Sequence, residues 1–427
     1  MQPGAAAAAA AATVVPVATV AAVVALNNVE ASEIYTPEVN SLNGQSILIT
    51  GGTTGLGLET AKRLAIGSPD NLIITARTSE KGQDAVDKIY KYLSVEGIES
   101  DTISISYKVL DLDDVQGIQN SVNGWFEDES SAFPDQLDCI INNAGVMAIP
   151  KLELTDDGIE RQMASNHLGH FVLTKMFSSK LSKRAKVINV SSSAHEGAKP
   201  NGMDFDYCWD GSPNYSPWKS YAQSKLANIL FSQELQRRSD EAGYEWDVAC
   251  LHPGVITSTD LFARQPLGKE NFQRFQELQG IVQDRIPTSV MDGLDTLSTK
   301  IGDLGLIKTI EQGATTSVWL ASGAYQKKDS GDGDDDDDIK IRTNAQCYED
   351  CKPKSLDTFA MNEKAAQRLW KESEERAGIT FDLAQSDEID EIAAVEETPD
   401  VVNSEKEQEE GGDEDLFTED DTEEEED

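Results

Sequence analysis

Short runs of β-branched and aliphatic residues alternate with longer stretches of helical periodicity from about residue 44 onward. This alternation is typical of a parallel α/β sheet, in which a crossover helix follows each strand. We expect helices at Gly55–Ala65 and Ser79–Leu93, and a closing helix at Met361–Ala377. The expected strands are Ser46–Thr50, Asn71–Ala76, Ile103–Leu110, Leu137–Asn142, Lys186–Ser191 and Asp247–His252. The pattern therefore predicts an α/β fold with one doubly wound parallel sheet and helices on both faces.

Acidic residues are concentrated at the carboxyl end of the chain. The formal net charge is −41, and residues 386–427 hold 22 Asp and Glu against one Lys. Like charges with few apolar residues cannot repay the entropy of folding, and an acidic surface disfavours nucleic acid as a partner. We therefore divide the chain into an Ala-rich low-complexity leader at 1–41, one folded domain at 42–380 with an acidic loop insertion at 326–341, and a disordered acidic tail at 381–427.

The leader contains an uncharged run, Ala5–Leu26, that is long enough to span a bilayer. Most of this run is alanine, and it includes Thr13, Pro16 and Thr19, so little free energy favours its transfer into lipid. We favour a disordered or weakly helical leader, with membrane association through this run as the alternative. The first 61 residues contain no Lys or Arg, which argues against a secretory signal and an Arg-rich transit peptide.

The cysteines show no framework of paired spacings. They are Cys139, Cys208, Cys250, Cys347 and Cys351. We expect reduced thiols in a reducing intracellular compartment, with the cytoplasm favoured over a plastid or membrane-associated location. His167 and His170 lie close together in the sequence, but no carboxylate or cysteine ligand set accompanies them, so no metal site is expected.

A glycine-rich motif, TGGTTGLG at Thr50–Gly57, lies between an expected strand and an expected helix. In this context Gly51 permits a tight turn, Gly55 lets the backbone approach a pyrophosphate, and Gly57 allows close helix packing. The motif predicts a dinucleotide-binding turn of the Rossmann type. The next strand ends in Arg77 without an acidic residue nearby, and an Arg suits a 2′-phosphate better than it suits the ribose of NAD. We therefore expect NADP(H) as the cofactor rather than NAD.

Tyr221 and Lys225 stand four residues apart in SYAQSKLAN, so on a helix they share one face. An ammonium close to a phenol favours the phenolate, and Lys225 is therefore expected to lower the pKa of Tyr221. Tyr221 would then pass a proton to or from an alcohol oxygen. Because such pairs also occur by chance on solvated helix faces, the catalytic interpretation depends on the neighbouring motifs.

Further motifs follow the glycine turn in order: VLDLDD, NNAG, SNHLGHF, VINVSSSAH and LHPGVIT. With them the chain resembles the short-chain dehydrogenase/reductase family from about Leu42 to Ala377. NHLGHFVLTK, YAQSKLAN and CYEDC are most similar to its retinol-dehydrogenase-like and WW-domain-oxidoreductase-like branch, although no WW domain is present. The resemblance implies Asn166 and Ser192 as catalytic partners of Tyr221 and Lys225. Ser191 and Ser193 remain alternatives to Ser192.

The same resemblance implies a cofactor cleft that collects residues from several motifs. In the family, Asp111 lies against the adenine and the Pro253–Thr257 segment passes the nicotinamide. The implied cofactor-binding residues are Gly51, Thr53, Thr54, Gly55, Leu56, Gly57, Arg77, Asp111, Leu112, Asn143, Ala144, Gly145, Tyr221, Lys225, Pro253, Gly254 and Thr257.

The expected activity is NADP(H)-dependent interconversion of a carbonyl, either an aldehyde or a ketone, and an alcohol through the Tyr, Lys, Ser and Asn groups. The expected substrate is small and hydrophobic, with a retinoid among the candidates, and the resemblance allows a homodimer. Two alternatives stay open at this point. One is an NADP(H)-sensing regulatory or scaffold protein, and the other is a tetrapyrrole reductase similar to protochlorophyllide reductase.

Overall fold

The structure is a computed structural model that describes residues 33–99, 103–128, 133–212, 214–256, 308–324 and 342–383. Four of the sequence expectations fall outside these residues. They concern the Ala-rich run, Thr257, the acidic insertion and nearly all of the acidic tail.

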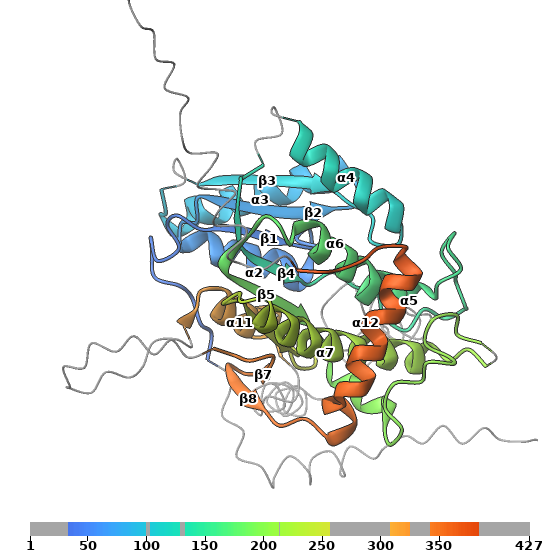
Figure 1. Ribbon diagram of the computed structural model, residues 1–427. Helices are drawn as coiled ribbons and strands as arrows, with labels where there is room; N and C mark the ends of the chain where they lie inside the picture. The colour runs from blue at the N-terminus through green and yellow to red at the C-terminus, as the bar shows by residue number, and fades with distance from the viewer. Residues whose placement is uncertain are drawn as a thin grey trace, which may run out of the picture. The chain divides into compact units, whose positions relative to one another are not determined.

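The described residues form one mostly parallel sheet in the order β3-β2-β1-β4-β5-β6-β7-β8 (Figure 1). All neighbours pair in parallel except β7 and β8, which are antiparallel. The strands are β1 Ser46–Ile49, β2 Asn71–Ala76, β3 Ser104–Val109, β4 Leu137–Asn142, β5 Leu181–Val190, β6 Asp247–Leu251, β7 Cys347–Glu349 and β8 Lys352–Lys354. The predicted doubly wound α/β fold is confirmed.

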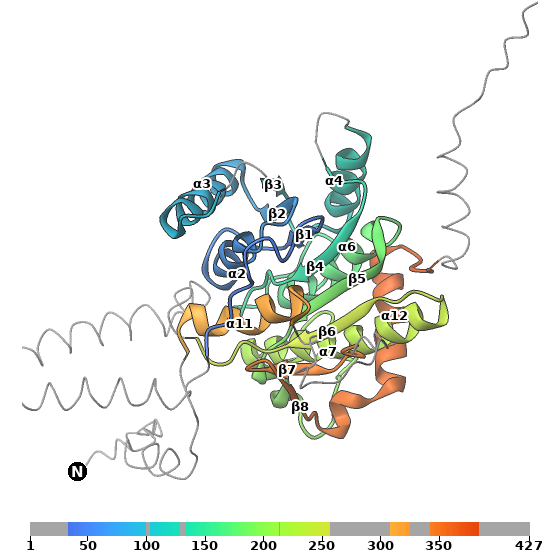
Figure 2. The ribbon, with the colours of Figure 1, turned by 90° about the vertical axis from the view of Figure 1, so that its left-hand side faces the viewer.

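Helices cover both faces of this sheet (Figure 2). The α-helices are α2 Gly55–Ile66, α3 Ser79–Glu96, α4 Val115–Glu127, α5 Arg161–Met163, α6 Gly169–Phe177, α7 Pro217–Glu241, α11 Ile310–Ala321 and α12 Glu363–Ala377. Helices α2, α3 and α11 form one layer, whereas α4, α6, α7 and α12 form the other. The central strand β1 is buried on both faces, as expected for a parallel sheet between two helical layers.

Helix α12 closes the second layer by packing on α7. Its Trp370 is 2% exposed, and the ring centroid lies 5.0 Å from that of Phe171 and 4.7 Å from that of Phe381. Phe381 is fully buried. The expectation that the tail begins at residue 381 is therefore wrong by at least this residue, because an aromatic side chain just beyond the helix completes the core.

The β7–β8 hairpin was not expected from the sequence. Each strand has three residues, which is too short for a periodicity to emerge, and Asp350 and Cys351 adopt positive φ angles of 52° and 56° in the turn between them. The register places Cys250 of β6 opposite Cys347 of β7, and a disulfide joins the two. The expectation that all cysteines are reduced is wrong for this pair. Their sequence separation of 97 residues concealed a contact that only strand pairing creates.

Among the described residues, none of the helices has both the length and the apolar character that crossing a bilayer requires.

Candidate active site

A cleft of about 770 Å³ runs along the carboxyl ends of the parallel strands. This is where ligands bind in open α/β sheets, and the volume lies within the ordinary range of cofactor sites. Most of the residues named from the sequence line it. They are Gly51, Thr53, Thr54, Gly55, Leu56, Gly57, Arg77, Asp111, Leu112, Asn143, Ala144, Gly145, Ser192, Tyr221, Lys225, Pro253 and Gly254. Asn166 lies immediately behind this lining, and Thr257 is outside the described residues.

The glycine turn is shaped by a close backbone approach. Gly51 and Gly55 have φ angles of 66° and 54°, a conformation that favours glycine. A Cβ added to Gly57 would lie 2.5 Å from Nδ2 of Asn143 and closer still to the carbonyl oxygen of Gly51. The sequence predicted that Gly57 allows close helix packing. The close contacts of Gly57 are instead with the turn itself and with the segment after β4.

The Thr50 hydroxyl joins the turn after β1 to the NNAG segment after β4. It accepts hydrogen bonds from the backbone N–H groups of Asn143 at 2.9 Å and Ala144 at 3.0 Å. The Asn143 side chain in turn donates to the Thr50 carbonyl oxygen at 2.8 Å. These bonds hold two loops of the cleft at a fixed separation, so NNAG is more than an ordinary turn at the end of a strand.

Tyr221 and Lys225 lie in α7, as the spacing predicts, and both side chains are buried, with exposures of 5% and 4%. The Lys225 Nζ atom donates to the Val190 carbonyl oxygen at 3.0 Å and lies 5.8 Å from the Tyr221 ring centroid. Burial lowers the pKa of the Lys225 ammonium to about 8. The lysine is therefore close to losing its charge at slightly alkaline pH.

The phenol of Tyr221 behaves differently from the sequence expectation. Burial raises the pKa of Tyr221 to about 12, and a hydrogen bond with Ser192 opposes this rise. Burial, rather than the nearby lysine, dominates this pKa, and the Lys225 Nζ atom donates to the Val190 carbonyl oxygen instead of to the phenol. In this structure Tyr221 is a protonated phenol at neutral pH, which suits a proton donor.

The three serines after β5 have distinct surroundings. Ser191 is 2% exposed, and its hydroxyl donates to the Lys225 carbonyl oxygen at 2.8 Å. Ser192 faces the cleft close enough to Tyr221 to lower the pKa of the phenol, and its Oγ accepts from the Ala194 N–H at 3.2 Å. Ser193 lines the cleft too. Of the three serines, only Ser192 acts on the pKa of Tyr221.

Asn166 lies in a π-helical turn, Ala164–Leu168, between α5 and α6. Such turns occur frequently at functional sites because they redirect one side chain. The Asn166 amide donates to the Val146 carbonyl oxygen and to the Ser224 hydroxyl, both at 2.9 Å, and its Oδ1 accepts from the Val146 N–H at 2.8 Å. Asn166 thus ties the segment after β4 to α7, next to Lys225.

His167 and His170 face different partners. The His170 imidazole spans from Thr50 Oγ1 at 2.8 Å to the Asn166 carbonyl oxygen at 2.9 Å, whereas His167 Nε2 contacts Ser373 Oγ at 2.9 Å. Burial lowers the pKa of both, to about 4 and about 3 respectively. His170, which the sequence reading considered only as a metal ligand, therefore links the glycine turn to Asn166. In the described part of the chain, no cluster of three His, Cys, Asp or Glu side chains could hold a metal ion.

Two cations lie at the opposite end of the cleft. Arg77 is exposed just after β2, and Lys81 follows in the first turn of α3, whose N-cap is Thr78. Asp111, after β3, is exposed and accepts from the Asp113 N–H at 3.0 Å. Lys81 was not predicted from the sequence as a residue of the cleft. Its position four residues after Arg77, at the start of a helix, could have indicated it.

The sequence reading also missed apolar groups around Tyr221. Met147, Ala148 and Ala194 pack against Tyr221, and the Trp218 ring lies edge-on to it with centroids 6.2 Å apart. Trp218 is half exposed and lines the cleft. Its position one helical turn before Tyr221 was visible in the sequence, but its orientation was not.

A family model described as short chain dehydrogenase matches residues 45–208. The relative named Short-chain dehydrogenase TIC 32 B, chloroplastic, from Brassica napus, is 31% identical over 330 residues, which cover 76% of this chain and 85% of that protein. The chain belongs to the short-chain dehydrogenase/reductase family. Retinol dehydrogenase 13 from Homo sapiens is 31% identical over 367 residues, or 84% of this chain and 93% of the relative.

A solved structure supports the same assignment at the level of fold. It is a crystal structure of an uncharacterized protein from Mycobacterium paratuberculosis, with a TM-score of 0.53 and 26% identity, covering 82% of this chain and 100% of that one. As a short-chain dehydrogenase/reductase, the protein is an oxidoreductase of a family that binds NAD or NADP. The resemblance to the retinol-dehydrogenase-like branch is confirmed by these relatives.

The glycine turn gives a direct test of the cleft. We expect Gly57→Ala to weaken NADPH binding by about 10-fold or more, because the added methyl group forces the turn and Asn143 apart at a cost of about 1–3 kcal/mol. Titration of NADPH fluorescence measures this. The matched control is Gly124→Ala in α4, where an added Cβ meets nothing within 4 Å. Equal NADPH affinity in both variants would contradict the assignment of the turn.

Proposed function

We propose that this dehydrogenase interconverts an apolar carbonyl compound and its alcohol with NADP(H). One observation carries the proposal. Ser192, Tyr221 and Lys225 line one end of the cleft. Arg77 and Lys81 line its other end. The narrow glycine turn between the two ends has no room for a Cβ at Gly57, which fits a bound pyrophosphate.

The proposed chemistry uses a hydroxyl pair. NADPH, when bound, supplies the hydride. Ser192 donates a hydrogen bond to the carbonyl oxygen and orients it, while the protonated Tyr221 transfers its proton to that oxygen as negative charge develops. In the reverse direction the phenolate accepts the proton of the alcohol. The proximity of Ser192 to Tyr221 supports this pairing, because both side chains line the cleft and Ser192 lowers the pKa of the phenol.

Lys225 and Asn166 support this pair from behind. The Lys225 ammonium would stabilise the phenolate that Tyr221 becomes and would bind the nicotinamide ribose. Asn166 holds Val146 and Ser224, and a Cβ added to Gly145 would lie only 2.9 Å from Asn166 Oδ1. We infer that Asn166 fixes the position of Lys225 relative to the segment at the base of the cleft. We also infer that it maintains the water path by which Tyr221 is reprotonated.

The substrate class follows from the groups around Tyr221. Met147, Ala148, Ala194 and Trp218 offer an apolar surface beside the reactive phenol. An apolar aldehyde or ketone would bury its body there and leave its oxygen at Ser192. The relatives named retinol dehydrogenases support an apolar alcohol or aldehyde, with a retinoid among the candidates.

Replacement of Tyr221 tests the proton transfer. Tyr221→Phe keeps the ring and its packing but removes the acid, so we expect kcat for carbonyl reduction to fall by about 100-fold or more with little change in the Kd for NADPH. An NADPH-consumption assay over retinal, medium-chain aldehydes and quinones measures this. Tyr244→Phe, at a buried tyrosine outside the cleft lining, is the matched control. Full activity in Tyr221→Phe would refute the assignment.

The pKa of Lys225 predicts a pH dependence. Burial lowers it to about 8, so kcat/KM for reduction should be level below about pH 8 and fall above it as the charge is lost. Tyr221, with a pKa of about 12, remains protonated in this range. The pKa of Lys225 is 10.5 in the unfolded chain and about 8 in the folded protein. Between these two pH values the unfolded state binds more protons, so Lys225 makes the free energy of unfolding rise with pH. Stopped-flow rates with parallel thermal unfolding would distinguish titration from denaturation; a constant kcat/KM up to pH 10 would contradict the role.

Arg77 tests the cofactor preference. We expect Arg77→Ala to lower kcat/KM with NADPH by about 10-fold while leaving the value with NADH nearly unchanged, since only NADPH carries the 2′-phosphate that the guanidinium would pair with. Initial rates with both cofactors measure this. Arg184→Ala, an exposed arginine paired with Glu245 away from the cleft, serves as the control. An unaltered ratio of the two values in Arg77→Ala would remove Arg77 from cofactor selection.

A further inference from the structure

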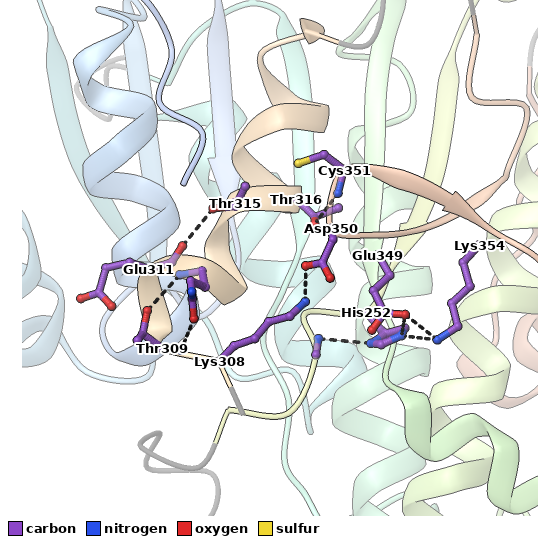
Figure 3. Close-up of polar contacts among 12 residues, drawn as sticks. His252, Lys308, Thr309, Glu311, Thr315, Thr316, Glu349, Asp350, Cys351 and Lys354 are labelled. Atoms are coloured by element: carbon purple, nitrogen blue, oxygen red, sulfur yellow. Dashed lines mark hydrogen bonds and ion pairs between the residues drawn. The ribbon is translucent and has the colours of Figure 1, made fainter. Parts of the chain in front are cut away.

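Two adjacent acidic residues of the β7–β8 hairpin, Glu349 and Asp350, contact side chains that border one wall of the cleft. Glu349 ends β7, and Asp350 follows in the turn. The wall is the segment Pro253–Ile256, which follows β6 and lines the cleft. Figure 3 shows the two carboxylates reaching toward this segment from the same side, one to His252 and the other to Lys308.

The first contact acts through an imidazole. His252 Nδ1 accepts from the Gly254 N–H at 3.2 Å, and Nε2 on the other side of the ring lies 2.9 Å from Glu349 Oε2. Lys354 Nζ donates to the same carboxylate oxygen at 2.7 Å and lies 2.6 Å from His252 Nε2. Burial would raise the pKa of Glu349, but these two hydrogen bonds outweigh it and hold the pKa at about 2. Glu349 is thus ionised and fixes the orientation of the ring that holds Gly254.

The second contact acts through a lysine. Lys308 is 4% exposed, its Nζ pairs with Asp350, and its backbone N–H donates to the Val255 carbonyl oxygen at 2.8 Å. The stem of Lys308 lies against Gly254, where an added Cβ would be 2.6 Å from Cδ and Cε of the lysine. A buried ammonium requires a partner, so Asp350 keeps Lys308 in place against the wall.

The hairpin itself is anchored on both sides. The disulfide between Cys250 and Cys347 and the bond from the His252 N–H to the Tyr348 carbonyl oxygen at 3.0 Å fasten β7 to β6. The Cys351 N–H donates to Thr316 Oγ1 of α11 at 3.2 Å. The two carboxylates therefore project from a fixed support, and the wall takes its position from them.

The wall lies at the reactive end of the cleft. In the sheet order, β6 is next to β5, which leads to Ser192, whereas Arg77 follows β2 three strands farther along. We propose that Glu349 and Asp350 are positioning residues that set the wall Pro253–Ile256 for the nicotinamide half of the cofactor, without touching the cofactor themselves. This inference rests on the proposed function of the cleft.

The test compares a whole dinucleotide with a fragment that lacks nicotinamide. In Glu349→Gln and Asp350→Asn, we expect the Kd for NADPH to rise by about 10-fold, the scale of one charge-assisted hydrogen bond. The Kd for 2′,5′-ADP, which reaches only the Arg77 end, should change by less than about twofold. Calorimetric titration measures both values, and thermal unfolding is recorded alongside. Glu245→Gln, which removes an exposed carboxylate paired with Arg184, is the matched control.

A double variant separates positioning from general damage to the fold. Lys308→Met removes the charge that Asp350 neutralises, so Lys308→Met with Asp350→Asn should bind NADPH no worse than either single variant. Equal weakening of NADPH and 2′,5′-ADP, or no weakening of either, would overturn the inference. If the wild-type protein binds NADH instead of NADPH, the same comparison is made with NADH and ADP-ribose. A wild-type protein that binds neither dinucleotide overturns the proposed function itself.

Discussion

The close approach of two backbone segments, one after β1 and one after β4, is the constraint on which the rest of the site depends. The Thr50 hydroxyl holds the N–H groups of Asn143 and Ala144, and no Cβ fits at Gly57. His170 connects Thr50 to the backbone of Asn166, whose amide holds Val146. The glycine turn and Asn166, to which the proposed function gives cofactor binding and support of proton transfer, are therefore parts of one hydrogen-bonded unit.

The buried polar groups of α7 explain why this hydrogen-bonded unit must hold its side chains in fixed positions. Taking Lys225 out of water lowers its pKa to about 8, and taking Tyr221 out of water raises its pKa to about 12. Burial thus favours the neutral form of each group. The Val190 carbonyl and the Ser192 hydroxyl satisfy them without a charged partner. Tyr221 is therefore a protonated phenol at neutral pH, and in the proposed mechanism a substrate oxygen and the lysine would stabilise the phenolate that forms.

Local patterns predicted the six long parallel strands, the glycine turn, the helical pairing of Tyr221 with Lys225 and the closing helix. Each of these depends on residues close together in the sequence. The β7–β8 hairpin, the disulfide between Cys250 and Cys347, and the burial of Phe381 were missed or wrongly predicted. They depend on pairings between residues far apart in the chain. The expected lowering of the Tyr221 pKa failed for a related reason, because helical spacing gives proximity to Lys225 but does not reveal how deeply tertiary packing buries the phenol.

The sequence by itself determined the doubly wound sheet and the chemical types of the groups at its carboxyl edge, because strand periodicity and motif spacing are local properties. Only the tertiary structure decided which of three serines lies beside Tyr221, that His170 joins the glycine turn to Asn166, and that Glu349 and Asp350 pair with His252 and Lys308. Those contacts join segments that are distant in sequence. They exist because packing the helices and the last hairpin against the sheet brings polar groups from these segments within hydrogen-bonding distance of one another.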